Sequence, residues 1–178
     1  MEPVAVQDML VIIFYGHFVL RDQWCDAGDD GESLTASRGQ VAAASTYQLT
    51  VQALSHTARL TLRVWDSEPA PDGDAWDGRR ELALHCPTGD LVVDQITAGS
   101  RPAVTLPAGE GVYSMRVHWK HRERARTAIM ETYERHRDRP FEDLTAALKE
   151  LDGTEHFLVD AWRQGPLPPG DDDDDDFY

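Results

Sequence analysis

Alternation of apolar and polar side chains dominates the first two thirds of the chain. Residues 47–53 alternate strictly, and other short segments are rich in β-branched and aromatic side chains. A period of two places successive side chains on opposite faces of a strand. These segments predict strands over 11–20, 41–54, 60–65, 82–86, 91–96, 104–106, 112–119 and 156–162.

Turns rich in Pro and Gly separate the predicted strands at regular intervals. Residues 87–90 read Pro-Thr-Gly-Asp, which predicts a hairpin between 82–86 and 91–96, and residues 107–111 form a second such turn. In 112–119, Tyr113, Met115 and Val117 share one face with Trp119. Short strands with this spacing favour an antiparallel β-sandwich over a parallel α/β sheet.

The period changes at His121. Residues 121–139 consist largely of strong helix formers, and 141–151 carry apolar residues at helical spacing before Asp152-Gly153. We therefore predict a single mainly β domain over 1–165, with a two-helix insertion at 121–151 before the last strand. Residues 166–178 include six consecutive aspartates, and we predict a disordered acidic tail there.

Composition adds a strong charge to this picture. The chain holds 32 acidic and 17 basic residues, a formal net charge of −15. Such a chain repels nucleic acid and anionic lipid, and it attracts proteins with basic clefts. We expect a basic protein partner, no direct contact with nucleic acid or membrane, and, without a signal peptide or apolar span, a cytoplasmic location.

Two predicted loops, 22–32 and 66–77, hold five carboxylates each. We expect these carboxylates to contact the partner in place of phosphates, with Trp76 as an aromatic anchor, whereas we expect Trp65 to pack within the fold. The candidate contact residues are Asp26, Asp29, Asp30, Glu32, Asp66, Glu68, Asp72, Asp74, Trp76 and Asp77.

Other chemistries have weaker support. Asp72, Asp74 and Asp77 are the best candidate calcium ligands, but they lack EF-hand spacing. His118 and His121 are interpreted as surface residues at a strand end, and no metal or cofactor is expected. No nucleophile–base pair or phosphate loop is visible, so we do not expect an enzyme.

Two alternatives remain open at this point. One is a ligand-binding or enzymatic sandwich with a cavity between its sheets, lined by residues such as Tyr47, Trp119 and Trp162. The other is a calcium-dependent binding module, which would gain stability on binding calcium.

The order of several short segments resembles the competence nuclease inhibitor family, the ComJ-like or Nin-like proteins. Tyr15-Gly-His-Phe-Val19 precedes an acidic loop, followed by Gly39-Gln-Val-Ala-Ala43 and a strand pair ending near Trp65. Further segments follow in the family's order: Gly89-Asp-Leu-Val-Val93, Val104-Thr-Leu-Pro-Ala-Gly109, Tyr113-Ser-Met-Arg-Val117 and His156-Phe-Leu-Val-Asp-Ala-Trp162. The resemblance implies an inhibitor or immunity-type protein that binds a nuclease.

Overall fold

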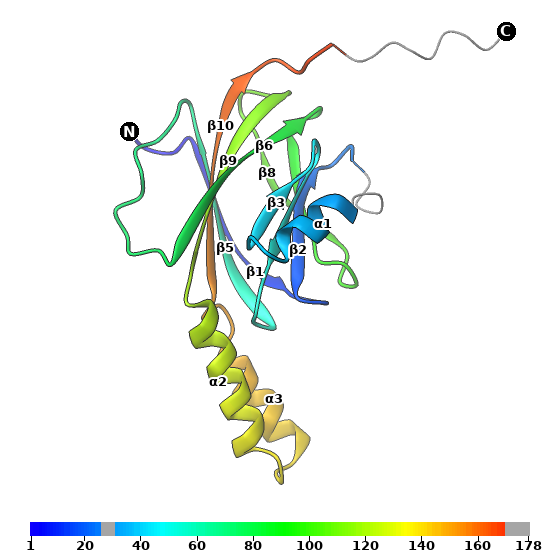
Figure 1. The fold of residues 1–178 in the computed structure, drawn as a ribbon, viewed down its shortest axis with the longest axis vertical. Helices are drawn as coiled ribbons and strands as arrows, with labels where there is room; N and C mark the ends of the chain where they lie inside the picture. The colour runs from blue at the N-terminus through cyan, green and yellow to red at the C-terminus, as the bar shows by residue number, and fades with distance from the viewer. Residues whose placement is uncertain (26–30, 170–178) are drawn as a thin grey trace, which may run out of the picture.

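The computed structural model describes residues 1–25 and 31–169, which form two five-stranded sheets packed face to face (Figure 1). Sheet A has the order β1-β5-β10-β9-β6, and sheet B has the order β3-β4-β2-β7-β8. The strands are β1 (Ala5–Ile12), β2 (His17–Asp22), β3 (Ala42–Ala44), β4 (Gln48–Gln52), β5 (Thr57–Trp65), β6 (Gly78–Cys86), β7 (Asp90–Asp94), β8 (Ser100–Thr105), β9 (Gly111–Lys120) and β10 (His156–Gly165). The helices are α1 (Gly31–Ser37), α2 (Arg122–Arg135) and α3 (Phe141–Lys149).

The core fills the space between the two sheets. The predicted inner face of β9 is confirmed, because Tyr113, Met115 and Val117 are almost fully buried there. Across the core, the rings of Phe18 in β2 and Phe157 in β10 meet edge to face, with centroids 5.6 Å apart. The predicted β-sandwich with a two-helix insertion is therefore confirmed.

Several predicted boundaries are wrong. The segment 11–20 divides into β1 and β2 because Tyr15 and Gly16 both have positive φ and form a tight turn inside an apolar run. The segment 41–54 divides into β3 and β4. Helix α1 and the first half of β1 were not predicted. The pair 82–86 and 91–96 is not a hairpin, since β6 belongs to sheet A and β7 to sheet B.

One strand pair departs from the antiparallel pattern. Strand β10 pairs antiparallel with β9 and parallel with β5, with Trp162 opposite Trp65. Because β6 is antiparallel to β9, β5 and β6 run in the same direction with two strands between them. The connection between β5 and β6 must therefore return along the whole length of sheet A.

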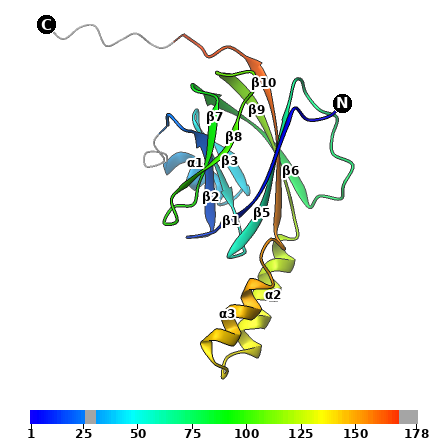
Figure 2. The same cartoon turned by 180° about the vertical axis from the view of Figure 1, so that it is seen from behind.

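The two inserted helices project from one end of the sandwich, opposite the end where β10 finishes (Figures 1 and 2). Ala125, Ile129 and Thr132 of α2 are buried, whereas Phe141 at the start of α3 is 78% exposed. None of the described helices is both long and apolar enough to cross a bilayer.

Candidate functional site

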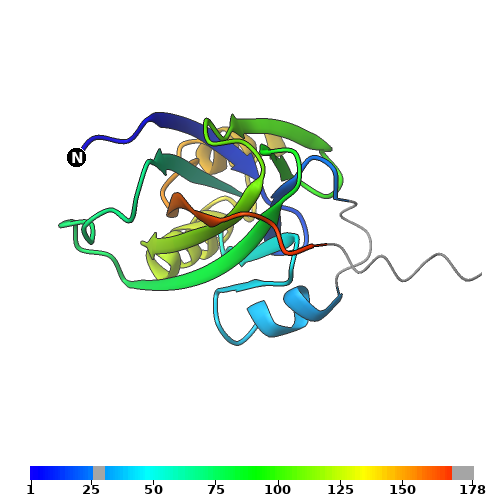
Figure 3. The same ribbon diagram turned by 90° about the horizontal axis from the view of Figure 1, so that it is seen from above.

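Residues 66–77, which we call the acidic strap, connect β5 to β6 along the side of sheet A that faces away from sheet B. Figure 2 shows the strap as the long loop beside β6, and Figure 3 shows it on a different side of the sandwich from α1. The strap takes this course because the connection between β5 and β6 must return along the length of sheet A. Its twelve residues are long enough to run back along a strand of nine. The topology thus brings five predicted contact residues and Trp76 together over one sheet face.

Two strap carboxylates form ion pairs with arginines of this sheet face. An Asp72 oxygen lies 2.8 Å from Nη2 of Arg63, and a Glu68 oxygen lies 2.6 Å from Nη2 of Arg116. Asp72 also accepts a hydrogen bond from Nε1 of Trp76 at 3.3 Å. Burial alone would raise the pKa of Asp72, but hydrogen bonds from the Asp74 backbone N–H, Trp76 and Arg63, together with the Arg63 charge, lower it. Each arginine also pairs with a second carboxylate, Arg63 with Asp160 and Arg116 with Glu81, so the negative charge of the strap is only partly offset.

Trp76 packs onto the sheet. Its ring centroid lies 5.4 Å from that of His118 and 5.2 Å from that of His156, and Nζ of Lys120 lies 4.4 Å from it. Nζ of Lys120 also approaches Asp74 at 3.8 Å. In this structure, Trp76 anchors the strap to the body of its own molecule.

A buried polar network lies beneath the strap. The carboxylate of Asp160 is fully buried and accepts hydrogen bonds from Nε and Nη2 of Arg63, at 2.7 and 3.0 Å, and from Nε1 of Trp65 at 2.7 Å. Burial would raise the pKa of Asp160, but His118, Arg63 and Trp65 outweigh it and hold this pKa at about 2. Trp65 packs within the fold, as expected from the sequence.

Two histidines of this sheet face, His118 and His156, are not fully exposed at the surface. His118 is only 2% exposed, so its interpretation as a surface residue is wrong. Its Nε2 lies 3.6 Å from Asp160, too far for a hydrogen bond. Burial, together with Lys120 and Arg59, lowers the pKa of His156 to about 4. His121, by contrast, is exposed at the start of α2.

The remaining predicted contact residues have different surroundings. Glu32 is exposed in the first turn of α1, and Asp66 is exposed at the start of the strap. Asp77 accepts a hydrogen bond from the backbone N–H of His121 at 2.6 Å. Asp26, Asp29 and Asp30 lie outside the described residues.

The strap does not gather the proposed calcium ligands. Within 1–25 and 31–169, no cluster of three or more His, Cys, Asp or Glu side chains is placed to hold a metal ion. Asp72 points to Arg63, and Asp77 to the backbone of His121. Tyr47, Trp119 and Trp162 do not share a cavity either. Trp162 lies on the outer face of sheet A, where the Arg116 guanidinium stacks over it at 4.7 Å.

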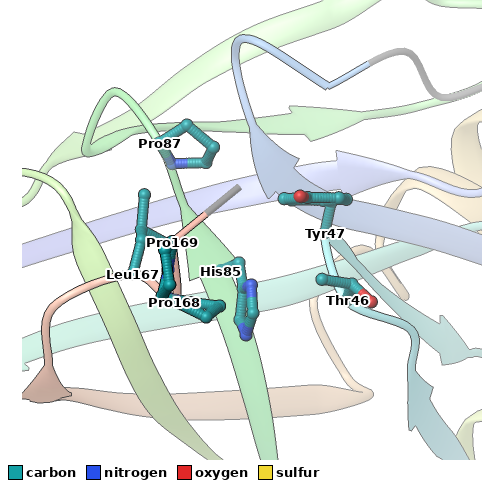
Figure 4. Close-up of a pocket in the computed structure, with 7 residues that line it drawn as sticks. All are labelled: Thr46, Tyr47, His85, Pro87, Leu167, Pro168 and Pro169. Carbon is teal, nitrogen blue, oxygen red and sulfur yellow. The ribbon is translucent and has the colours of Figure 1, made fainter. Parts of the chain in front are cut away.

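A separate groove lies at the end of the sandwich where β10 finishes (Figure 4), and we call it the aromatic groove. Its volume is about 370 Å³, at the small end of the range for ligand sites. His85, near the end of β6, stands between the β3–β4 turn and the segment after β10. The groove is lined by Thr46, Tyr47, His85, Pro87, Leu167, Pro168 and Pro169.

A row of aromatic rings extends this groove across the surface. The Tyr47 ring meets His85 on one side and Trp24 on the other, in both cases edge to face at 5.7 Å between centroids. Trp24 is 65% exposed although it is the largest type of apolar side chain. The sequence does not predict this row, because its members, at positions 24, 47 and 85, lie far apart along the chain. A signal that could have indicated it is Trp24, a large apolar side chain beside the first acidic loop.

Asp22 fixes the end of the sandwich that carries the groove. It is fully buried and accepts hydrogen bonds from the backbone N–H groups of Trp24, Thr88 and Gly89 and from the Thr88 hydroxyl. One carboxylate thus connects the end of β2, which precedes Trp24, to the corner between β6 and β7. The groove is built on a rigid corner of the fold.

Charge is distributed unevenly along the chain. The described residues include all 17 basic residues and 23 of the 32 acidic residues, which gives them a net charge of −6. The other nine carboxylates belong to the sequence segments 26–30 and 171–176. The first follows directly after Cys25 in the sequence, and the second follows Gly170.

Comparisons with known proteins identify the fold. No family model matches the sequence, and no curated protein matches it. Among solved structures, ComJ from Bacillus subtilis, an inhibitor of the DNA-degrading activity of NucA, matches with a TM-score of 0.56 and 14% identity, over 92% of this chain and 98% of that chain. The product of crocagin biosynthetic gene J matches with a TM-score of 0.55 and 14% identity, over 90% and 97%. The resemblance drawn from the order of sequence segments is confirmed at the level of the fold.

Proposed function

We propose that this protein binds and inhibits a nuclease, or another enzyme with a basic phosphate-binding cleft, and that it is not itself an enzyme. The observation that carries the proposal is the concentration of acidic residues in two short sequence segments. The segments 26–30 and 171–176 hold nine acidic and no basic residues, whereas Glu68 and Asp72 of the strap lie beside arginines. Sequence segments this acidic favour association with a basic partner.

The shared fold supports the same proposal. ComJ, whose structure this chain matches over almost its whole length, inhibits a DNA-degrading nuclease. A fold alone does not determine function, because unrelated activities occur on the same scaffold. The acidic segments supply the independent chemical argument, since a polyanion competes with DNA for a cationic cleft. We further propose that the encounter takes place in the cytoplasm.

The predicted contact residues divide into two sets under this proposal. Asp26, Asp29, Asp30 and Glu32 remain the principal contacts of the first loop. Asp66, Glu68, Asp72, Asp74 and Asp77 of the strap, with Trp76, contribute a secondary surface. In the strap, Asp72 would have to exchange its Arg63 contact for a contact with the partner, which reduces the gain from binding.

The test is an inhibition assay with a purified DNA-degrading nuclease. DNA cleavage is measured as the protein is titrated in, at several salt concentrations. We expect inhibition that weakens as salt screens the exposed charges. Neutralising residues 26, 29 and 30 to Asn, or ending the chain after Pro169, should each lower the association rate by about tenfold.

A matched control neutralises three exposed carboxylates of the helical insertion, Glu142, Asp143 and Glu150. It removes the same amount of charge as the Asn variant at the opposite end of the molecule, and it should leave inhibition within about twofold. An equal loss in the control would show that only total charge matters. Absence of inhibition with every basic nuclease tested would contradict the proposed function.

A further inference from the structure

The aromatic groove offers ligands an unusual set of polar groups. Three of its lining residues, Pro87, Pro168 and Pro169, lack a backbone N–H, so their backbone can only accept hydrogen bonds. Beside them lie the rings of Tyr47 and Trp24, whose faces carry partial negative charge. Acceptors and aromatic faces together favour a positively charged, hydrogen-bond-donating ligand.

Charge near the groove acts in the same direction. The sequence continues into three aspartates shortly after Trp24, and into six aspartates soon after Pro169. Arg21, the basic side chain closest in sequence to Trp24, is engaged within the fold. Its Nη2 lies 3.4 Å from an Asp94 oxygen, and Nη1 donates to the backbone carbonyl of Cys25. The sequence on either side of the groove residues is therefore acidic, which favours a cationic ligand.

We propose that the aromatic groove receives an arginine or lysine side chain from a surface loop of a basic partner protein. The cation would lie against the faces of Trp24 and Tyr47, while its N–H groups donate to acceptors of the groove. The volume of about 370 Å³ suits one or two side chains. The inference rests on the proposed function and identifies its central contact.

The probe is a synthetic peptide of alternating arginine and glycine, and its affinity for the full chain is measured by calorimetry. The same peptide with neutral citrulline in place of arginine tests the need for charge. Trp24→Ala should weaken binding of the arginine peptide about five- to tenfold. Thr46→Arg, which adds a positive charge at the exposed rim of the groove, should weaken it at least tenfold.

Two control variants make the same chemical changes at the other end of the molecule. Phe141→Ala removes an aromatic ring that is 78% exposed, and Thr127→Arg adds a charge on the exposed side of α2. Both should bind the arginine peptide within about twofold of the unchanged protein. Trp24→Leu retains an apolar side chain without an aromatic face, and it should behave like Trp24→Ala.

Three results would overturn the inference. The arginine peptide could bind all variants equally or none of them, or the citrulline peptide could bind as tightly as the arginine peptide. Sedimentation could instead show self-association that Trp24→Ala abolishes, in which case a second copy occupies the groove. Each result leaves the nuclease inhibition assay unaffected, so failure here is distinguishable from failure of the proposed function.

Discussion

Replacing Asp160 with asparagine tests whether the network beneath the strap stabilises sheet A. This carboxylate is fully buried, and Arg63 and Trp65 donate three hydrogen bonds to it at 2.7 to 3.0 Å. Removing one partner of a buried ion pair costs about 3–5 kcal/mol. Arg63 is 22% exposed and retains Asp72 at 2.8 Å, so we expect a loss at the low end of that range, about 3 kcal/mol.

Acid provides a second measure of the same interaction. The pKa of Asp160 falls from 3.8 to about 2 in the folded protein. A group whose pKa is lowered by folding stabilises the fold above its unfolded pKa and loses this contribution as the pH falls. We therefore expect about 2 kcal/mol of stability, present above pH 4 and lost as the pH falls through about 2.

The assay is urea unfolding of the unchanged protein and of Asp160→Asn between pH 7 and pH 2. The difference in unfolding free energy should be about 3 kcal/mol at pH 7 and should shrink by about 2 kcal/mol in acid. Asp152→Asn, at an exposed position beyond α3, is the control and should change stability by less than about 0.5 kcal/mol. A difference below about 1 kcal/mol at pH 7, or one independent of pH, would refute the reasoning.

Three further predictions concern other buried groups. Glu155→Gln should lower the unfolding free energy by about 3 kcal/mol, because this fully buried carboxylate accepts two hydrogen bonds from backbone N–H groups and one from a hydroxyl. The control Glu150→Gln, at an exposed position, should have almost no effect. Gly89→Ala should cost more than Gly99→Ala in the same denaturation assay. Both glycines have positive φ, but only at Gly89 would a Cβ lie 2.8 Å from backbone atoms. The thiol of Cys86 should resist alkylation at pH 8 in the native protein, because burial and a neighbouring carboxylate raise its pKa to about 12. Rapid labelling without unfolding, followed by mass spectrometry, would contradict this.

The sandwich was predictable because alternation reports directly on which strand face is buried. In β9 the inner face follows the pattern at Tyr113, Met115 and Val117, although Ser114, Arg116 and His118 on the outer face are buried too. The pattern failed at Tyr15-Gly16, where a turn lies within an apolar run and Ile13 stays buried beside it. It also missed α1, a helix of seven residues with weak helix formers that relies on tertiary contacts such as the one between Ser33 and Thr50.

The candidate site was less predictable, since it depends on contacts between residues far apart in the sequence. A count of carboxylates identified the strap. It could not show that Asp72 and Glu68 would meet Arg63 and Arg116, because that depends on β5 and β6 running parallel with two strands between them. The aromatic groove has the same origin, as Tyr47 lies in the turn between two strands of sheet B and His85 belongs to β6 of sheet A.

Net charge therefore overstates the acidity that a partner would meet at most of the surface. At physiological salt an exposed charge acts over a screening length of about 8 Å. Arg63 lies 2.8 Å from Asp72 and 2.7 Å from Asp160, so beyond the screening length it cancels one of these two negative charges. The segments 26–30 and 171–176 hold nine further acidic residues and no basic ones, and we expect them to contribute most to the long-range field. A basic partner would be oriented toward these segments before contact, so the salt dependence of its association rate should follow changes in 26–30 and 171–176 more strongly than changes in the strap.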